Sequence, residues 1–124
     1  MRIEDMIEAL EGLSAPDRKS DEAIARLCGY SLDIVPGDAN GGEQKKVWSF
    51  GDPPEPTRLP TFTSNLDRAM QFAEAKFPNH AAAISWRGER YQARLNEDGP
   101  VADGPTAALA LCIATLRTMM ANQS

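Results

Sequence analysis

The stretch Pro60-Thr61-Phe62-Thr63-Ser64-Asn65-Leu66-Asp67-Arg68-Ala69-Met70 contains the clearest helix start in this 124-residue chain. Ser64 is a candidate N-cap, because its hydroxyl can accept a hydrogen bond from a free amide of the first turn. Asp67 lies three residues later and can reach back to the Ser64 amide, as in a capping box. Apolar side chains then recur at helical spacing and predict one apolar face: Leu66, Ala69, Met70, Ala73 and Phe77. Pro78 ends the predicted helix, since proline disfavours helical backbone at the preceding residue.

The strongest strand signal follows this helix. Residues 82–87 and 90–95 flank the two-residue loop Gly88-Glu89, and glycine at the first loop position suits a type II′ turn. This loop pairs Arg87 with Arg90 and separates the side chains into two faces. The apolar face contains Ala82, Ile84, Trp86, Tyr91, Ala93 and Leu95. The polar face contains Ala83, Ser85, Arg87, Arg90, Gln92 and Arg94. A slip of one residue would mix the two sets, so the pattern supports this register.

Two shorter helices are predicted before the opening stretch. Residues 3–13 carry apolar side chains at helical spacing among acidic ones, which is typical of an amphipathic helix. Asp17 or Ser20 can cap a second helix, and Gly29 is well placed to end it in the left-handed region. The link between these helices is short, so we expect them to pack as a pair.

The remaining elements give weaker signals. Two short strands are predicted from alternating polarity and β-forming side chains, at residues 30–34 and 45–50. The prolines within residues 53–60 predict an extended connector with little freedom to join a sheet or a helix. We expect residues 96–103 to form a loop. Asp103, or alternatively Thr106, can cap a long apolar helix that ends near Met120.

The order of these elements predicts an α+β fold. Hairpin-connected strands imply an antiparallel sheet of about three to four strands, including the hairpin 82–87/90–95. We expect helices to pack on both faces of this sheet, as an α/β/α sandwich. A chain of this length is most economically a single domain, here residues 1–124.

Composition narrows the function classes. Hydrophobic residues make up 42% and charged residues 25% of the chain, which is ordinary for a globular protein. No apolar run is long enough to span a membrane, and the acidic N-terminus lacks a signal core, so we expect a cytoplasmic protein. The net charge of −5 argues against direct nucleic-acid binding. Cys28 and Cys112 lie in helical patterns and are interpreted as small buried hydrophobes rather than a disulfide.

Recognisable catalytic and cofactor motifs are absent from the sequence. No Cys or His cluster has metal-ligand spacing, and there is no phosphate-binding glycine loop or nucleophile elbow. His80 is interpreted as a surface or packing residue, and Ser64 with Asp67 as a cap rather than a site. The sequence therefore predicts no catalytic, cofactor-binding or metal-binding residues.

The candidate contact residues are three arginines and one tryptophan. Arg87, Arg90 and Arg94 share the polar face of the predicted hairpin, with like charges opposite one another at Arg87 and Arg90. This face is either solvated, paired with acidic helix residues, or a contact for an acidic partner or phosphate. Trp48 lies beside the proline-rich connector and is interpreted as a core or lid residue, with partner contact as the alternative.

Three stretches taken together carry a resemblance: residues 10–18 with 21–25 and 27–30, residues 62–69, and residues 104–112 with 114–117. The middle stretch is similar to the pattern Tyr-Thr-x-Ser-Leu-Asp-x-Ala, with Phe62 in place of the tyrosine. In order and spacing the stretches resemble the phage ABA sandwich domain family, small proteins of phages and prophages. The resemblance implies a sheet with helices on both faces and a phage or prophage origin, and it supplies no catalytic residues.

The leading hypothesis is a non-enzymatic phage or prophage accessory protein that binds another protein of the host or the phage. A first alternative is an acidic inhibitor of a host nucleic-acid enzyme or defence system, because seven acids face three bases in the first 22 residues. It requires those acids to cluster on one face. A second alternative is a small ligand-binding domain or enzyme, which requires a concave pocket with convergent polar groups. An exposed edge strand or apolar patch could also make a homodimer.

Overall fold

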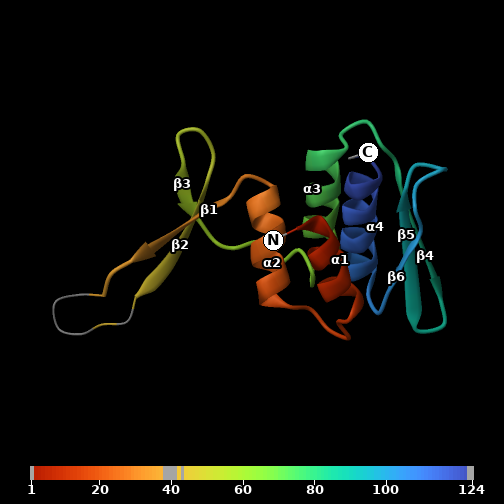
Figure 1. Ribbon diagram of the computed structural model, residues 1–124, viewed down its shortest axis with the longest axis horizontal. Coiled ribbons are helices and arrows are strands. Elements are labelled where there is room, and N and C mark those ends of the chain that lie inside the picture. The colour runs from red at the N-terminus through yellow and green to blue at the C-terminus, as the bar shows by residue number, and fades with distance from the viewer. Residues whose placement is uncertain (1, 38–41, 43, 123–124) are drawn as a thin grey trace.

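The computed structural model of the chain describes residues 2–37, 42 and 44–122 (Figure 1). The described residues form helices α1 (Ile3–Glu11), α2 (Arg18–Leu27), α3 (Leu66–Lys76) and α4 (Ala107–Ala121). The strands are β1 (Ser31–Val35), β2 (Lys45–Phe50), β3 (Glu55–Thr57), β4 (Ala82–Arg87), β5 (Arg90–Leu95) and β6 (Ala102–Gly104). They form two antiparallel sheets, sheet A in the order β1-β2-β3 and sheet B in the order β4-β5-β6.

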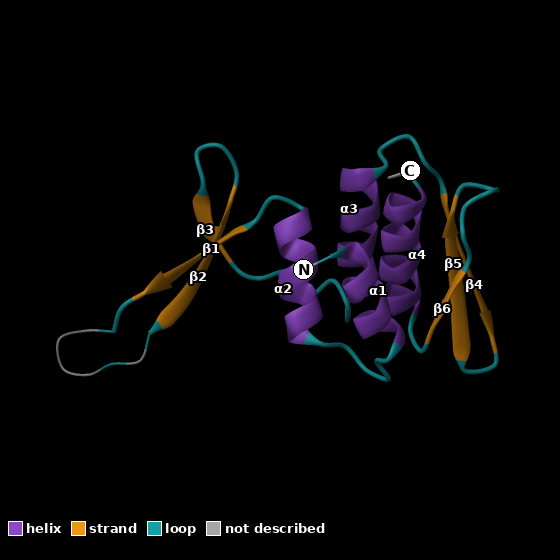
Figure 2. Cartoon of the chain, in the orientation of Figure 1, coloured by secondary structure: helices purple, strands orange, loops and turns teal. Residues whose placement is uncertain are grey.

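The α+β class and the packing of helices on antiparallel strands are confirmed. The layer order differs from the expected single sheet between two helical layers. The helices lie between sheet A and sheet B, and no element formed by the described residues covers the far face of sheet B (Figure 2). Because β5 pairs with β6 rather than with β2, the strands divide into two sheets. This arrangement leaves one face of sheet B open to solvent.

The core is built around α4. Its residues from Ala108 to Leu116 are all buried, because α4 packs against α1, α3, β5 and β6 at once. A helix that is apolar on every side requires such a position. Gly104 at the end of β6 lets this strand lie very close to α4, since a Cβ at Gly104 would lie 2.8 Å from the Ala110 nitrogen. The short helices α1 and α2 contact each other as predicted.

The opening stretch is held in place by a buried carboxylate on α2. Asp21 is 1% exposed, and its Oδ1 accepts hydrogen bonds from the Thr63 amide at 2.8 Å and the Thr63 hydroxyl at 2.9 Å. Arg18 donates to the other carboxylate oxygen at 2.7 Å and also to the carbonyls of Leu59 and Pro60. Asp17 caps α2 through the Ser20 amide at 3.0 Å, as one of the two predicted caps. We call Arg18, Asp21 and Thr63 the buried polar cluster.

The predicted start of α3 is wrong by one residue. Asn65, rather than Ser64, caps α3 and accepts from the Arg68 amide at 3.2 Å, while the Ser64 hydroxyl donates to the Thr61 carbonyl. The buried side chains of α3 are those that face α4, namely Ala69, Phe72 and Ala73. The predicted apolar face differs from the observed buried face in two ways. It included Leu66 and Met70, which are 37% and 40% exposed, and it omitted Phe72, which is fully buried.

Two short strands form where the sequence indicated loops. Pro56 lies in β3, which pairs with β2 at the edge of sheet A, so the connector does join a ladder. Proline is tolerated in an edge strand because its missing amide donor is not needed there. Residues 102–104 form β6, and the helix cap moves from Asp103 to the alternative Thr106, which accepts from the Leu109 amide at 3.2 Å. The glycines and proline of residues 36–42 also predict a turn, and residues 38–41 of that stretch lie outside the described residues.

The predicted hairpin register is confirmed along its whole length. All six expected pairs are present, from Ala82 with Leu95 to Arg87 with Arg90. Gly88 has a φ of +64°, and Asn96 is the non-glycine residue with positive φ in the described chain. Because Glu89 is not in the left-handed region, the turn has the geometry of type II′, with positive φ at its first position alone.

Candidate functional site: the outer face of sheet B

The candidate site is the face of sheet B that points away from α4, which we call the outer face. Antiparallel partners point to the same side of a sheet, so the observed register defines the residues of this face. Across the three strands it contains Ala83, Ser85, Arg87, Arg90, Gln92, Arg94 and Asp103. All of these residues are exposed. Val101, immediately before β6, is exposed beside this face.

The three predicted arginines are brought together on the outer face. Arg87 lies directly opposite Arg90 across the hairpin turn, and Arg94 lies on the same face of β5 opposite Ala83. Within the described chain, none of the three guanidinium groups makes a hydrogen bond or an ion pair. The expected pairing with acidic helix residues is therefore wrong, because no helix covers this face (Figure 1). The outer face presents three guanidinium groups that form no ion pair in the described chain, although the Asp103 carboxylate shares this face.

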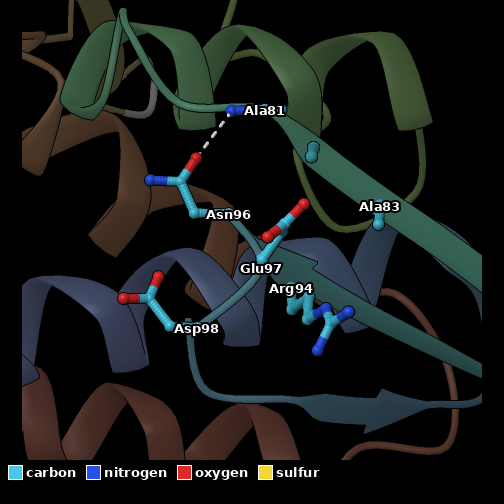
Figure 3. A pocket seen from close by; sticks show the side chains of 7 residues that line it. Ala81, Ala83, Arg94, Asn96, Glu97 and Asp98 are labelled. Atoms are coloured by element: carbon cyan, nitrogen blue, oxygen red, sulfur yellow. Dashed lines mark hydrogen bonds between the residues drawn. The ribbon is translucent and has the colours of Figure 1, made fainter.

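The outer face is hollowed at the end nearest Arg94. A hollow of about 640 Å³ is lined by residues 81–83, Arg94 and the turn after β5. Asn96 adopts a φ of 63° and its side chain accepts from the Ala81 amide at 3.0 Å, which closes this end of the hairpin. Figure 3 shows the Arg94 and Asp98 side chains pointing away from each other. The polar groups of this hollow do not converge on one point as those of a catalytic site do.

The fourth predicted contact residue lies elsewhere. Trp48 is 6% exposed and belongs to the core of the molecule. It pairs with Leu32 and Thr57 in sheet A, and the Arg26 guanidinium lies 5.9 Å from its ring centroid. The partner-contact alternative for Trp48 is therefore wrong, because the ring is covered by its own chain.

The tryptophan that does reach solvent is Trp86. It was assigned to the apolar hairpin face, yet it is 75% exposed. Trp86 lies on edge strand β4, one residue before Arg87, the last residue before the turn. By contrast, Ala93 and Leu95 on the central strand β5 are buried against α4. The sequence predicted the position of Trp86 beside the turn. Its exposure depends on which elements cover β4, and the sequence pattern does not give this.

Nucleophilic and metal-binding chemistry gains no support from the described residues. Both cysteines are free, and burial raises the pKa of the Cys28 thiol to about 11, although Lys76 opposes this shift. Burial also raises the pKa of the Cys112 thiol, whose Sγ donates to the Phe62 carbonyl. His80 packs on Phe77, with ring centroids 4.8 Å apart. No group of three metal-ligating side chains occurs in the part of the chain that the structure describes.

The acids near the N-terminus do not form one acidic surface. Glu4 pairs with Arg2, Glu11 with Arg117, and Glu22 with Lys46, while Asp21 is buried against Arg18. Asp17 is used as the cap of α2. Most of these acids are thus engaged individually, and their partners come from four different parts of the chain.

Comparison with known proteins adds no family to these observations. No family model matches the chain, and no curated protein or solved structure matches it. Of the helices in the described residues, none has the length and apolar character needed to cross a bilayer.

Proposed function

We propose that this chain is a non-enzymatic accessory protein that binds an acidic surface of another protein through the outer face of sheet B. The observation that supports this proposal most is the set of three exposed arginines without intramolecular partners. Arginine binds carboxylates with two parallel hydrogen bonds, and it is enriched in protein interfaces. Like charges opposite each other at Arg87 and Arg90 cost stability in the free chain, and a carboxylate partner would remove that repulsion.

A protein partner fits this face better than a nucleic acid. Sheet surfaces that bind single-stranded RNA or DNA stack bases on aromatic side chains. The outer face carries alanine, serine, glutamine, valine, aspartate and arginine but no aromatic side chain within the described residues. The net charge of −5 would also repel a phosphate backbone at long range. A carboxylate-bearing protein surface needs only the local positive potential.

The size of the face predicts the kind of complex. Strands β4 and β5 have six residues each and β6 has three, so at a spacing of about 4.8 Å they give a face of at most roughly 14 Å by 20 Å. That is well below the ~800 Å² per partner of a stable interface. We therefore expect either transient binding, or a partner that also contacts the neighbouring hollow at residues 96–98. In both cases exposed charges dominate, so binding should weaken as salt rises.

The two alternative functions have less support. The acidic-inhibitor hypothesis required clustered N-terminal acids, and these are engaged separately by Arg2, Arg18, Lys46 and Arg117. The ligand-binding or enzyme hypothesis required convergent polar groups in a pocket, whereas the hollow beside Arg94 is open and its Arg94 and Asp98 side chains point away from each other (Figure 3). The phage or prophage origin is part of our proposal, and the sequence resemblance is its only support.

The proposal is tested by comparing what three versions of the tagged protein retain from nuclease-treated lysate of the cells that encode it. The first is the wild type, and the second replaces Arg87, Arg90 and Arg94 with glutamate. The third is a matched control that replaces Lys19, Lys45 and Arg58 with glutamate. These three cations are exposed and lie away from sheet B, so both variants have the same net charge.

We expect one protein with an acidic surface to be retained by the wild type and the control, to be lost from the outer-face variant, and to elute as salt rises. A partner retained equally by all three versions would contradict the proposal. Loss from both variants would indicate that only net charge matters, which would also contradict a site on sheet B.

A further inference from the structure

Strand β4, at one edge of sheet B, is the edge strand in the described chain that is least protected from pairing with another strand. In sheet A, edge strand β3 has three residues and contains Pro56, and edge strand β1 carries the charged Asp33. The other edge of sheet B, β6, also has three residues. By contrast, β4 has six residues, and the only charge among them is Arg87 at its end. Edge strands are usually kept from pairing by being short, by containing proline or by carrying charges. Strand β4 is longer, contains no proline and is uncharged along most of its length.

The free hydrogen-bonding groups of β4 can be identified from its pairing. Ala81 donates to the Asn96 side chain at 3.0 Å and accepts from the Asn96 amide at 2.7 Å, so its backbone groups point toward β5. Backbone groups alternate in direction along a strand. The odd-numbered residues of β4 therefore bond to β5. Ala82, Ile84 and Trp86 direct their amides and carbonyls to the open edge.

The same three residues carry apolar side chains on the face toward the helices. Trp86 is 75% exposed, which is a large apolar surface to leave in water. At the other end of β4, a hollow of about 150 Å³ opens beside Ala82. Its wall is mainly apolar and comes from α3, the loop after it and β5: Met70, Ala73, Glu74, Phe77, His80 and Leu95. One strand thus carries both an exposed aromatic ring and an unfilled apolar hollow.

We propose that two copies of this chain associate through antiparallel pairing of β4 with β4, with Ile84 of one protomer opposite Ile84 of the other. In this register Trp86 of each protomer lies opposite Ala82 of its partner, on the face toward the helices. The indole then covers the partner's hollow beside Met70 and Phe77. The two sheets join into one sheet of six strands.

This register satisfies three separate requirements. It pairs Ala82, Ile84 and Trp86, whose backbone groups are free, and so forms about six new hydrogen bonds between protomers. It places the largest side chain of β4 against one of the smallest, so that both fit on one face. It also keeps the two copies of Arg87 roughly 20 Å apart along the strands, which avoids repulsion between them. The proposal does not depend on what the outer face binds.

The test is sedimentation velocity of the whole chain over about a hundredfold range of concentration. We expect the wild type to shift from monomer to dimer as concentration rises. Trp86→Glu should weaken dimerisation by about thirtyfold or more, the loss that follows removal of a central interface tryptophan. Because Trp86 is exposed in the monomer, this variant should remain folded. Val101→Glu is the matched control, an exposed apolar residue beside the opposite edge strand β6, and it should dimerise like the wild type.

The register is tested by cross-linking under mild oxidation. A cysteine introduced as Ile84→Cys should form a covalent dimer, because its Cα atoms would lie about 5.5 Å apart across the dimer axis. Arg87→Cys should not. Native Cys112 is buried and Cys28 is partly buried, so each variant is compared with the wild type, which carries the same two thiols. A wild type that stays monomeric throughout, a Trp86→Glu variant that dimerises normally, or cross-linking at position 87 instead of position 84 would each overturn the proposal.

Discussion

Polar side chains in the helical interior have hydrogen-bond partners within the chain, whereas the arginines on the outer face of sheet B have none among the described residues. In the interior, the Asp21 carboxylate accepts from Thr63 and Arg18, and no buried side-chain nitrogen or oxygen among the described residues lacks a partner. On the outer face, the guanidinium groups of Arg87, Arg90 and Arg94 have no partner among residues 2–37, 42 and 44–122. The hydrogen bonds of the interior stabilise the fold, and the guanidinium groups of the outer face are available to bind a partner.

This difference separates residues that maintain the fold from residues available for function. A buried carboxylate that loses its partners destabilises the native state, whereas exposed charges contribute little to it. We therefore expect substitutions in the interior to change stability. Substitutions on the outer face should change binding and leave stability almost unaltered. The following predictions test this division, from the largest expected effect to the smallest.

Truncating the central aromatic residue of α3 should have the largest effect. Phe72 is fully buried and contacts Phe62 edge to face, with ring centroids 6.1 Å apart. Phe72→Ala should cost about 3–5 kcal/mol of unfolding free energy through lost burial and the cavity left behind. The comparison is Trp86→Ala, in dilute solution where the monomer predominates, which should change stability by less than about 0.5 kcal/mol. Similar losses for both variants in urea unfolding would contradict the division.

Removing the buried carboxylate should have the next largest effect. Asp21→Ala leaves the buried Thr63 amide without its acceptor, removes one acceptor of the Thr63 hydroxyl and breaks the ion pair with Arg18. We expect a loss of roughly 3 kcal/mol in chemical unfolding. Asp33→Ala on β1 removes an exposed carboxylate and should cost no more than about 0.5 kcal/mol. If Asp21→Ala were as mild as its control, the buried polar cluster would not anchor the opening stretch.

The cysteines should report the closed interior through pH. Burial raises the Cys28 pKa from 9.0 to about 11, so the folded state favours the neutral thiol. This contribution to stability is fully present below about pH 9 and is lost as pH rises toward 11. Wild-type stability should therefore fall more steeply over this window than that of Cys28→Ala. At pH 8, iodoacetamide should label the native thiols far more slowly than those of the unfolded chain. Equal labelling rates would show that the interior is open.

Reversing the outer-face charges should have the smallest effect on stability. The variant that carries Arg87→Glu, Arg90→Glu and Arg94→Glu loses no intramolecular hydrogen bond or ion pair within the described chain. We expect its unfolding free energy to change by less than about 1 kcal/mol in total, since exposed substitutions usually stay within about 0.5 kcal/mol each. A large destabilisation in thermal or urea unfolding would mean that these arginines support the fold.

Local signals in the sequence predicted the local structure well. The two-residue loop at Gly88 and the alternation of side chains determined the whole hairpin register. Capping chemistry also limited the start of α2 to two candidates, Asp17 and Ser20, of which Asp17 is the observed cap. At α3 two adjacent residues could serve as the cap, and the choice between Ser64 and Asn65 was not local. The Thr63 amide is held by Asp21 on α2, a contact that the local pattern cannot reveal.

Features that depend on distant contacts were missed. Strand β6 has three residues and forms because β5 lies beside it, and Pro56 joins sheet A because an edge strand can tolerate its missing donor. For the candidate site, the sequence predicted that the three arginines share a face. It left open whether this face is covered, and the burial of Trp48 was one of its two interpretations. It did not predict that Trp86 is exposed. Each of these depends on which elements cover which sheet, a property of the complete fold.

The most direct test of the account compares paired and unpaired arginines in one NMR titration. A glutamate-rich peptide is added to the ¹⁵N-labelled protein, and the arginine Nε–Hε signals are followed at low and high salt. We predict that the signals of Arg87, Arg90 and Arg94 shift at low salt and return at high salt, while those of Arg18 and Arg117, which already bind carboxylates, stay in place. Equal shifts for all arginines, or shifts confined to Arg18 and Arg117, would contradict the outer face as the docking surface.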